Sequence, residues 1–291
     1  MIFNPTARGD KARTFRAYLD KISGQASLKP TTAGGEARQL AAAAVGEGFE
    51  VVVAAGGDGT VNEVLNGLAD ASGFASTQLA VLPLGTVNVF AKDLSIPTDF
   101  EGAWRVIQAG RVTVIDLPSA RFQRDGAEVH RHFAQLAGSG LDARAIELTS
   151  WPLKRKFGPL AYIVAGFQAF CGPQKKITAT SPERSAAGEL ILIGNGRFYG
   201  GRFRFFPKAQ FHDGLLDVCV FPRVGWLGVA HCGWGMLTDR MLDQAGAVHW
   251  QSAEITLQGD PATLLELDGE NVGGLPATLS VRARALSVIT P

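Results

Sequence analysis

The sequence predicts an α/β domain over residues 1–117 followed by an antiparallel β-sandwich domain over residues 118–291. Up to Asp116, apolar runs typical of buried strands alternate with helix-like segments, which indicates a mostly parallel sheet covered by helices. After Asp116, short strand-like runs separated by turn signals dominate, which is typical of an antiparallel domain. A chain of 291 residues is also long for one domain and comfortable for two.

Apolar patterning defines the expected elements of the first domain. Continuous apolar runs predict strands over residues 50–55 and 79–84 that are buried on both faces, and residues 1–4 look like a short piece of another strand. Helical periodicity or alanine content predicts helices over residues 10–22, 36–45, 61–69 and 88–94. Only three residues precede Asn4, so either the sheet tolerates a short first strand or the start is truncated.

The second domain is expected to consist of short strands with two helices between them. The strand-like runs are residues 131–137, 188–194, 215–221, 253–258, 263–267, 278–283 and 285–289. Turn signals separate several of these runs, among them Asp213-Gly214 and Asp268-Gly269. Helices are predicted near residues 157–174 and 226–239.

The predicted helix near residues 157–174 has two interpretations. The stretch is uncharged and directly follows Lys154, Arg155 and Lys156, but it is shorter than the about 20 apolar residues of a spanning helix. It is either a buried core helix or an amphipathic helix that contacts an anionic membrane. Residues 141–210 carry 11 Lys and Arg against 4 Asp and Glu, whereas residues 211–273 carry 2 against 9. This local charge difference is compatible with a peripheral membrane surface as a partner.

Composition excludes several classes of protein. Lys and Arg number 28 against 27 Asp and Glu, and this balance disfavours a dedicated nucleic-acid binder. Three cysteines are too few and too scattered for a disulfide framework or a four-ligand zinc site. No secretory signal is visible at the start, so a cytoplasmic setting is expected. The oligomeric state stays open, with a homodimer among the options.

Two glycine-containing loops at strand ends are the most informative motifs. Residues 56–60 read Gly-Gly-Asp-Gly-Thr, and residues 83–86 read Pro-Leu-Gly-Thr. Glycines let backbone N–H groups approach an anion, and a following helix adds a favourable dipole. Thr60 and Glu63 match a capping box that would fix the helix start. Each loop alone could be a plain strand-to-helix turn, but two in tandem favour a nucleotide triphosphate site at the carboxyl edge of the sheet.

These and other motifs resemble the diacylglycerol kinase and lipid kinase family, which also includes sphingosine kinases. The motifs, in family order, are Asn4-Pro5, GGDGTVNEVLNGL (56–68), PLGTVNVFA (83–91), GSGLDA (138–143), NGRFYGG (195–201), FHDGLLDV (211–218) and LDGE (267–270). The resemblance implies an N-terminal nucleotide domain like those of phosphofructokinases and NAD kinases, a C-terminal β-sandwich, and ATP and lipid meeting between them. NAD kinases share the first loop, so that loop alone does not define the family.

The resemblance also implies roles for particular residues. It places ATP contacts at Thr31, Gly57, Asp58, Gly59, Thr60, Val61, Asn62, Glu63 and Thr86. It places a magnesium ion at Gln210, Asp213 and Leu215, partly through main-chain carbonyls, with a structural role for Asp213. It assigns the glutamate of the LDGE motif, Glu270, as the proton acceptor.

Two carboxylates compete for the role of general base in phosphoryl transfer to an alcohol. Glu270 is favoured by its match to the family motif, although Asp-Gly before it also predicts an ordinary hairpin. Asp58 lies in the phosphate loop itself, where it would otherwise organise a metal ion or the phosphates. The family usually has aspartate where this chain has Val89, which bears on how the head group of the acceptor lipid is held.

The leading hypothesis is a cytoplasmic ATP-dependent lipid kinase that phosphorylates a hydroxyl group of a diacylglycerol-like lipid and takes part in phospholipid metabolism, with the peripheral membrane as its surface. Two alternatives stay open. One is a kinase of the NAD-kinase type that acts on a soluble metabolite, and the other is a lipid-binding homologue without catalytic activity.

Overall fold

The computed structural model describes residues 1–4, 15, 17–19, 22–141, 143–144, 175–201, 203–225 and 246–291. The chain forms two compact units. The first contains Met1–Leu117, Gly200–Arg202 and Arg282–Pro291, and the second contains Pro118–Tyr199 and Phe203–Val281. We expected residues 118–291 to form one domain, but the last ten residues lie with the first unit. The cause is strand β17 (Glu270–Ile289), which is 20 residues long and pairs through Val288 with Leu79 of the first unit.

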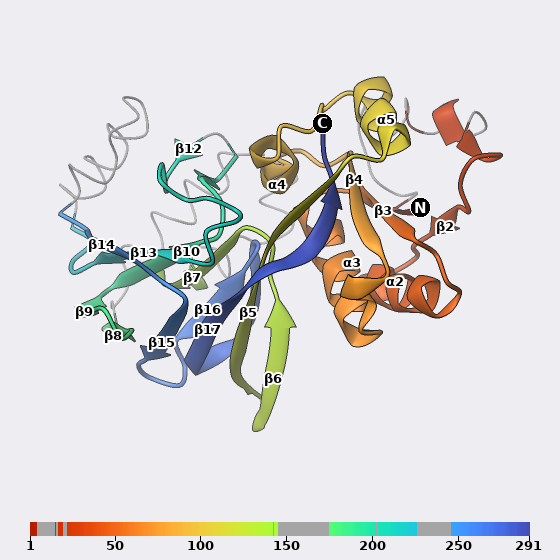
Figure 1. The fold of residues 1–291 in the computed structure, drawn as a ribbon. Helices are drawn as coiled ribbons and strands as arrows, with labels where there is room; N and C mark the ends of the chain where they lie inside the picture. Colours follow the sequence, from red (N-terminus) through yellow and green to blue (C-terminus); the bar gives the residue numbers. More distant parts are fainter. Residues whose placement is uncertain are drawn as a thin grey trace. The chain divides into compact units, whose positions relative to one another are not determined.

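A parallel sheet forms the centre of the first unit (Figure 1). Strand β1 (Ile2–Phe3) lies between β2 (Lys29–Pro30) and β3 (Val51–Gly56), and β3 pairs with β4 (Gln78–Pro83). All of these pairs are parallel, which confirms the expected parallel sheet and its buried strands. Because parallel strands share a direction, the loops that follow β2, β3 and β4 all leave the same edge of the sheet.

The helices of the first unit confirm part of the prediction and correct part of it. Helix α2 (Glu36–Gly46) and helix α4 (Val89–Asp93) lie where helices were expected. Helix α3 (Asp58–Asp70) begins three residues before the predicted start. Helix α5 (Phe100–Ala109) was not predicted; its N-cap is Asp99, whose side chain accepts a hydrogen bond from Gly102 N at 2.7 Å. The expected helix over residues 10–22 lies mostly outside the described residues. A short 3₁₀ helix, η1 (Gly73–Ala75), lies between α3 and β4.

Gly67 allows helices α2 and α3 to pack closely. A Cβ atom at Gly67 would overlap the carbonyl oxygen of Arg38 and would lie 2.7 Å from Ala41 Cβ. Both neighbours belong to helix α2, and a backbone carbonyl cannot rotate away. Close packing therefore depends on the absence of a side chain at this position.

We expect Gly67→Ala to lower the free energy of unfolding by about 1–3 kcal/mol, because the overlap outweighs the about 1 kcal/mol that alanine gains over glycine in a helix. Thermal and urea unfolding would measure the change. Gly46→Ala is the matched control, because Gly46 ends helix α2 and has open space around its Cβ position. A Gly67→Ala protein as stable as the wild type would contradict the close packing.

The second unit is an antiparallel β domain, as expected. Its strands, the first and last of which also run through the first unit, are β5 (Val112–Arg124), β6 (Ala127–His132), β7 (Leu136–Gly140), β8 (Ile177–Thr180), β9 (Ser185–Gly188), β10 (Leu190–Gly194), β11 (Phe198–Tyr199), β12 (Phe203–Arg204), β13 (Leu216–Phe221), β14 (Val248–Ser252), β15 (Glu254–Gln258), β16 (Leu264–Leu267) and β17. The order β14-β13-β10-β7-β16-β17 is antiparallel throughout, and β15 links β17 to β8.

Two expected strand boundaries in the second half of the chain are wrong. The run 131–137 contains a break, because residues 133–135 separate β6 from β7. The runs 278–283 and 285–289 belong to the single strand β17. The helices expected near 157–174 and 226–239, and the basic residues Lys154 to Lys156, lie outside the described residues.

Apolar side chains from several strands form the core of the second unit. Phe122, Phe133 and Ile177 are buried in it with residues of β10, β13, β15 and β17. A smaller cluster around Phe205 and Phe206 packs against Cys219 and Phe221. Among the described residues, no helix is long and apolar enough to cross a membrane.

Candidate active site

The two glycine-containing loops of the first unit lie in direct contact. Strands β3 and β4 are parallel neighbours in which Gly56 pairs with Pro83, and the N–H groups of Leu84 and Gly85 donate to Gly56 O at 2.9 and 3.2 Å. A Cβ atom at Gly85 would lie only 2.5 Å from the Cα atom of Gly57. The expected tandem arrangement at the carboxyl edge of the sheet is therefore confirmed.

Helix α3 begins at the first loop without a side-chain cap. Its N-cap residue is Gly57, and no side chain of that residue can accept from the first-turn N–H groups. These groups and the helix dipole favour an anion at this position. Asp58, the first helical residue, accepts a hydrogen bond through Oδ1 from Phe90 N at 3.2 Å. The Asp58 carboxylate thus ties the start of α3 to helix α4, which follows the second loop.

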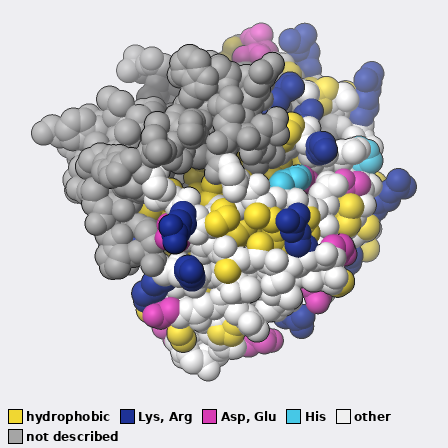
Figure 2. Space-filling model, turned by 90° about the vertical axis from the view of Figure 1, so that its left-hand side faces the viewer, with side chains coloured by type: hydrophobic (Ala, Val, Ile, Leu, Met, Phe, Trp, Pro, Cys, Tyr) yellow, Lys and Arg dark blue, Asp and Glu magenta, His cyan; other side chains and the backbone are white. Residues whose placement is uncertain are grey.

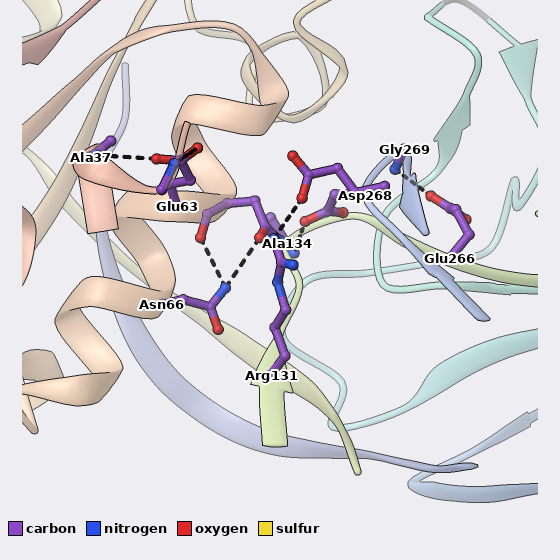
Figure 3. Close-up of polar contacts among 11 residues, drawn as sticks. Ala37, Glu63, Asn66, Arg131, Ala134, Glu266, Asp268 and Gly269 are labelled. Atoms are coloured by element: carbon purple, nitrogen blue, oxygen red, sulfur yellow. Dashed lines mark hydrogen bonds and ion pairs between the residues drawn. The ribbon is translucent and has the colours of Figure 1, made fainter. Parts of the chain in front are cut away.

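The capping box expected from Thr60 and Glu63 is wrong. The helix begins before Thr60, and the Glu63 carboxylate instead accepts from Gly35 N at 2.9 Å and from Ala37 N at 3.0 Å (Figure 3). Glu63 therefore supports the N-terminus of the neighbouring helix α2. Because the helix starts at Asp58, Glu63 is its sixth residue and lies past the first turn, where its side chain reaches the neighbouring helix instead of its own N-terminus.

Carboxylates accept hydrogen bonds at the start of helix α2 and in the loop that precedes it. In addition to Glu63, Glu36 accepts hydrogen bonds from Thr32 N, from Thr32 Oγ1 at 2.9 Å and from Ala33 N at 3.3 Å. The bond from Thr32 N is the main cause that lowers the pKa of Glu36. The N-cap residues of both helices are glycines without a capping side chain, but Glu63 accepts from two N–H groups at the start of α2, and an anionic ligand could take the corresponding place at α3.

The remaining nucleotide-site candidates lie at different depths. Thr31 follows β2 and is buried, with its N–H and hydroxyl groups donating to Phe3 O at 2.8 and 3.4 Å. Val61 and Asn62 face the interior, and Asn62 is only 1% exposed, so a ligand could reach these two residues only through the backbone. Gly59 and Thr60 are half-buried on the first turn of α3, and Thr86 is exposed on the second loop.

Asn88 closes the second loop in a conformation that few residues adopt. Its φ is +53°, and its Nδ2 donates to Gly85 O at 2.7 Å. The side chain is buried, and within the described part of the chain its Oδ1 has no hydrogen-bond partner. Asn88 Oδ1 is thus a buried acceptor without a partner among the described residues, 2.7 Å from the Cβ position of Gly85.

The expected magnesium site is a turn of the second unit. Gln210 and Asp213 are exposed, and Asp213 Oδ1 accepts from Leu215 N at 3.0 Å around Gly214, whose φ is +73°. The side-chain and main-chain oxygens of this turn are donors of the kind that Mg²⁺ prefers. In the described residues, no group of three or more His, Cys, Asp or Glu side chains is placed to hold a metal ion. The oxygen ligands that this turn could offer a cation are the Asp213 carboxylate, the Gln210 side-chain oxygen and main-chain oxygens.

Glu270 is the first residue of β17, directly after the Asp268-Gly269 turn. Its side chain is 46% exposed, and its Oε2 accepts from Arg131 Nη2 on β6 at 2.8 Å. The turn is the expected hairpin, because Leu267 pairs with Glu270. Asp268 and Arg131 were not singled out from the sequence. The Asp-Gly pair indicated the turn, but nothing in the sequence pattern indicated the hydrogen-bond partners of the Asp268 carboxylate or the pairing of Arg131 with Glu270.

Two family models match this chain and together cover most of it. The diacylglycerol kinase catalytic domain matches residues 1–120, and the YegS C-terminal NAD kinase beta sandwich-like domain matches residues 135–290. The predicted fold class, an α/β nucleotide-type domain with a β-sandwich-like domain, is thereby confirmed.

Curated relatives and solved structures resemble the chain over nearly its full length. A Pseudomonas aeruginosa protein named "Probable lipid kinase YegS-like" is 34% identical over 295 residues, which cover 98% of this chain and 91% of the relative. A diacylglycerol kinase of Staphylococcus saprophyticus is 30% identical over 301 residues, covering 100% and 94%. The crystal structure of a diacylglycerol kinase from Bacillus anthracis superposes with a TM-score of 0.76 at 24% identity, covering 100% and 95% of the two chains, which shows a shared fold.

Proposed function

This chain belongs to the diacylglycerol kinase family of lipid kinases, and we propose that it transfers the γ-phosphate of ATP to a hydroxyl group of a diacylglycerol-like lipid. The observation that carries the ATP part of the proposal is the contact between Gly57 and Gly85, which joins two glycine loops beside a helix start that has no side-chain cap. The relatives' names support a lipid acceptor.

In the proposed reaction the protein contributes positioning and charge more than covalent chemistry. The N–H groups at the start of α3 would hold the phosphates, and Asp58 would keep the two loops in register through Phe90 N. The acceptor hydroxyl would lose its proton to the Glu270 carboxylate as its oxygen forms a bond to the γ-phosphorus. The bond between that phosphorus and the β,γ-bridging oxygen breaks, and ADP leaves.

We assign the proposed magnesium ion of the second unit to Gln210, Asp213 and Leu215. When bound, the ion would supply positive charge that holds this turn together. Asp213 would give it one carboxylate oxygen, while the other stays bonded to Leu215 N. We propose no role for this ion in the transfer itself.

A peripheral contact with an anionic membrane surface is part of the proposal, because the acceptor is a lipid. On the face shown in Figure 2, hydrophobic side chains gather centrally, with Lys and Arg side chains around them and some Asp and Glu. Apolar groups between basic ones suit a bilayer with anionic headgroups. Co-sedimentation with phosphatidylglycerol vesicles, compared with phosphatidylcholine vesicles, would measure the contact.

One assay tests the function against its alternatives. The protein is incubated with labelled ATP, magnesium and, separately, diacylglycerol, phosphatidylglycerol, sphingosine or NAD. We expect label transfer to diacylglycerol or a related lipid alcohol. Transfer to NAD alone would instead indicate a kinase of the NAD-kinase type. Lipid binding without transfer to any acceptor would indicate a homologue that has lost its activity.

A further inference from the structure

The turn before Glu270 is held by a carboxylate that accepts three backbone hydrogen bonds. Asp268 Oδ2 accepts from Ala134 N at 2.7 Å, and Oδ1 accepts from Gln135 N at 2.9 Å and Leu136 N at 3.1 Å. The N–H group of Asp268 itself donates to Leu136 O at 2.9 Å. Figure 3 shows the Asp268 carboxylate directed at Ala134. Hydrogen bonds from N–H groups to a carboxylate are about twice as strong as neutral ones, so this contact fixes the turn to residues 134–136.

A second Asp-Gly turn in the same unit shows that the hairpin does not require this contact. Asp125 and Gly126 join β5 to β6 with φ values of +53° and +78°, close to the +48° and +90° of Asp268 and Gly269. The side chain of Asp125 is 93% exposed and lies 3.7 Å from Arg124 Nε. The same residue pair thus makes the same kind of turn with its carboxylate in solvent. The three part-buried hydrogen bonds of the Asp268 carboxylate are therefore not needed to form an Asp-Gly turn of this kind.

The side chain of Glu270 is held from the other side by Arg131. The Arg131 side chain is 16% exposed, and its guanidinium group donates to Glu270 Oε2 at 2.8 Å. Asp268 therefore fixes the backbone two residues before Glu270, and Arg131 fixes its carboxylate. A glutamate at the start of a strand would otherwise sample several rotamers, because nearly half of its side chain is exposed.

We propose that Asp268 and Arg131 are positioning residues that hold Glu270 in the orientation in which it accepts the proton of the acceptor hydroxyl. The inference rests on the proposed function, since it gives Glu270 the role of base. Proton acceptance depends on geometry, and a displacement of about 1 Å can cost about 100-fold in rate. Positioning residues of this kind change the catalytic step without changing ATP binding.

Steady-state kinetics of Asp268→Asn test the proposal. We expect kcat to fall about 10- to 100-fold while the KM for ATP stays within about twofold. Asparagine has one acceptor oxygen where aspartate has two, and its NH2 group cannot accept a hydrogen bond from a backbone N–H group. Asp125→Asn is the matched control and should keep wild-type kcat. Arg131→Gln, which leaves the turn intact, should lower kcat about 3- to 10-fold and decides the matter if Asp268→Asn does not fold.

A double-mutant cycle distinguishes positioning from a general loss of stability. In the Glu270→Gln background, Asp268→Asn should lower the residual single-turnover rate no further, while its effect on thermal unfolding persists. Additive losses of rate, or wild-type kcat in folded Asp268→Asn and Arg131→Gln, would overturn the inference. If Glu270→Gln keeps full turnover, the base assignment fails instead, and if the wild-type protein phosphorylates no lipid, the proposed function fails.

Discussion

Replacing Glu270 with glutamine is expected to lower turnover about 10²- to 10⁴-fold, to a small residual rate, while the affinity for ATP stays within about twofold of the wild-type value. A glutamine amide has nearly the same shape as the carboxylate but cannot accept a proton, and a general base contributes about 10²- to 10⁴-fold in rate. The expected structural cost is small, because the ion pair with Arg131 is partly exposed and such pairs contribute about 0–1 kcal/mol.

Labelled ATP with diacylglycerol in mixed micelles measures the turnover of this variant, and a fluorescent ATP analogue measures nucleotide binding. Glu128→Gln is the control, since Glu128 is an exposed glutamate on β6 of the same unit and should keep wild-type turnover. Retained turnover in Glu270→Gln would exclude Glu270 as the base. Asp58, the other carboxylate of the proposed machinery, would then become the leading candidate.

Gly85→Ala is expected to weaken ATP binding at least about tenfold and to lower the free energy of unfolding by about 1–3 kcal/mol. The new Cβ atom would lie 2.5 Å from Gly57 Cα, 2.7 Å from Asn88 Oδ1 and 3.2 Å from Gly57 N. Two of these neighbours are backbone atoms, so the two loops would have to move apart. Separation would shift the start of α3, where the phosphates are proposed to bind.

Isothermal titration with ATP and magnesium, together with urea unfolding, measures both effects of Gly85→Ala. Gly34→Ala is the control, because Gly34 lies in the loop before α2 and nothing surrounds its Cβ position. Unchanged ATP affinity in Gly85→Ala would show that the contact between the loops is not part of the nucleotide site. A loss of stability without a loss of affinity would give the contact a structural role only.

The parts of the fold that depend on local pattern were predictable from the sequence. Buried strands such as β3 and β4 appear as continuous apolar runs, and the Asp-Gly pair before Glu270 indicates a hairpin turn. The same reasoning placed the two glycine loops at one edge of the sheet, since parallel neighbours end on the same side.

Features that depend on long-range contacts were not predictable. Thr60 and Glu63 have the spacing of a capping box, but Glu63 finds its donors at Gly35 and Ala37, which are 28 and 26 residues away. Asp268 likewise finds N–H groups 132 to 134 residues away. No local pattern encodes such partners, because they depend on which elements the tertiary fold brings together.

The pairing of Val288 with Leu79 has a consequence for how the chain is made. On the ribosome, strand β4 emerges about 200 residues before the segment that completes its edge of the sheet. Thr290 N also donates to Arg111 O at 2.9 Å, and Arg284 N to Asp116 Oδ1 at 2.8 Å. The sheet of the first unit is therefore complete only after residues 282–291 have left the ribosome, about 200 residues after β4.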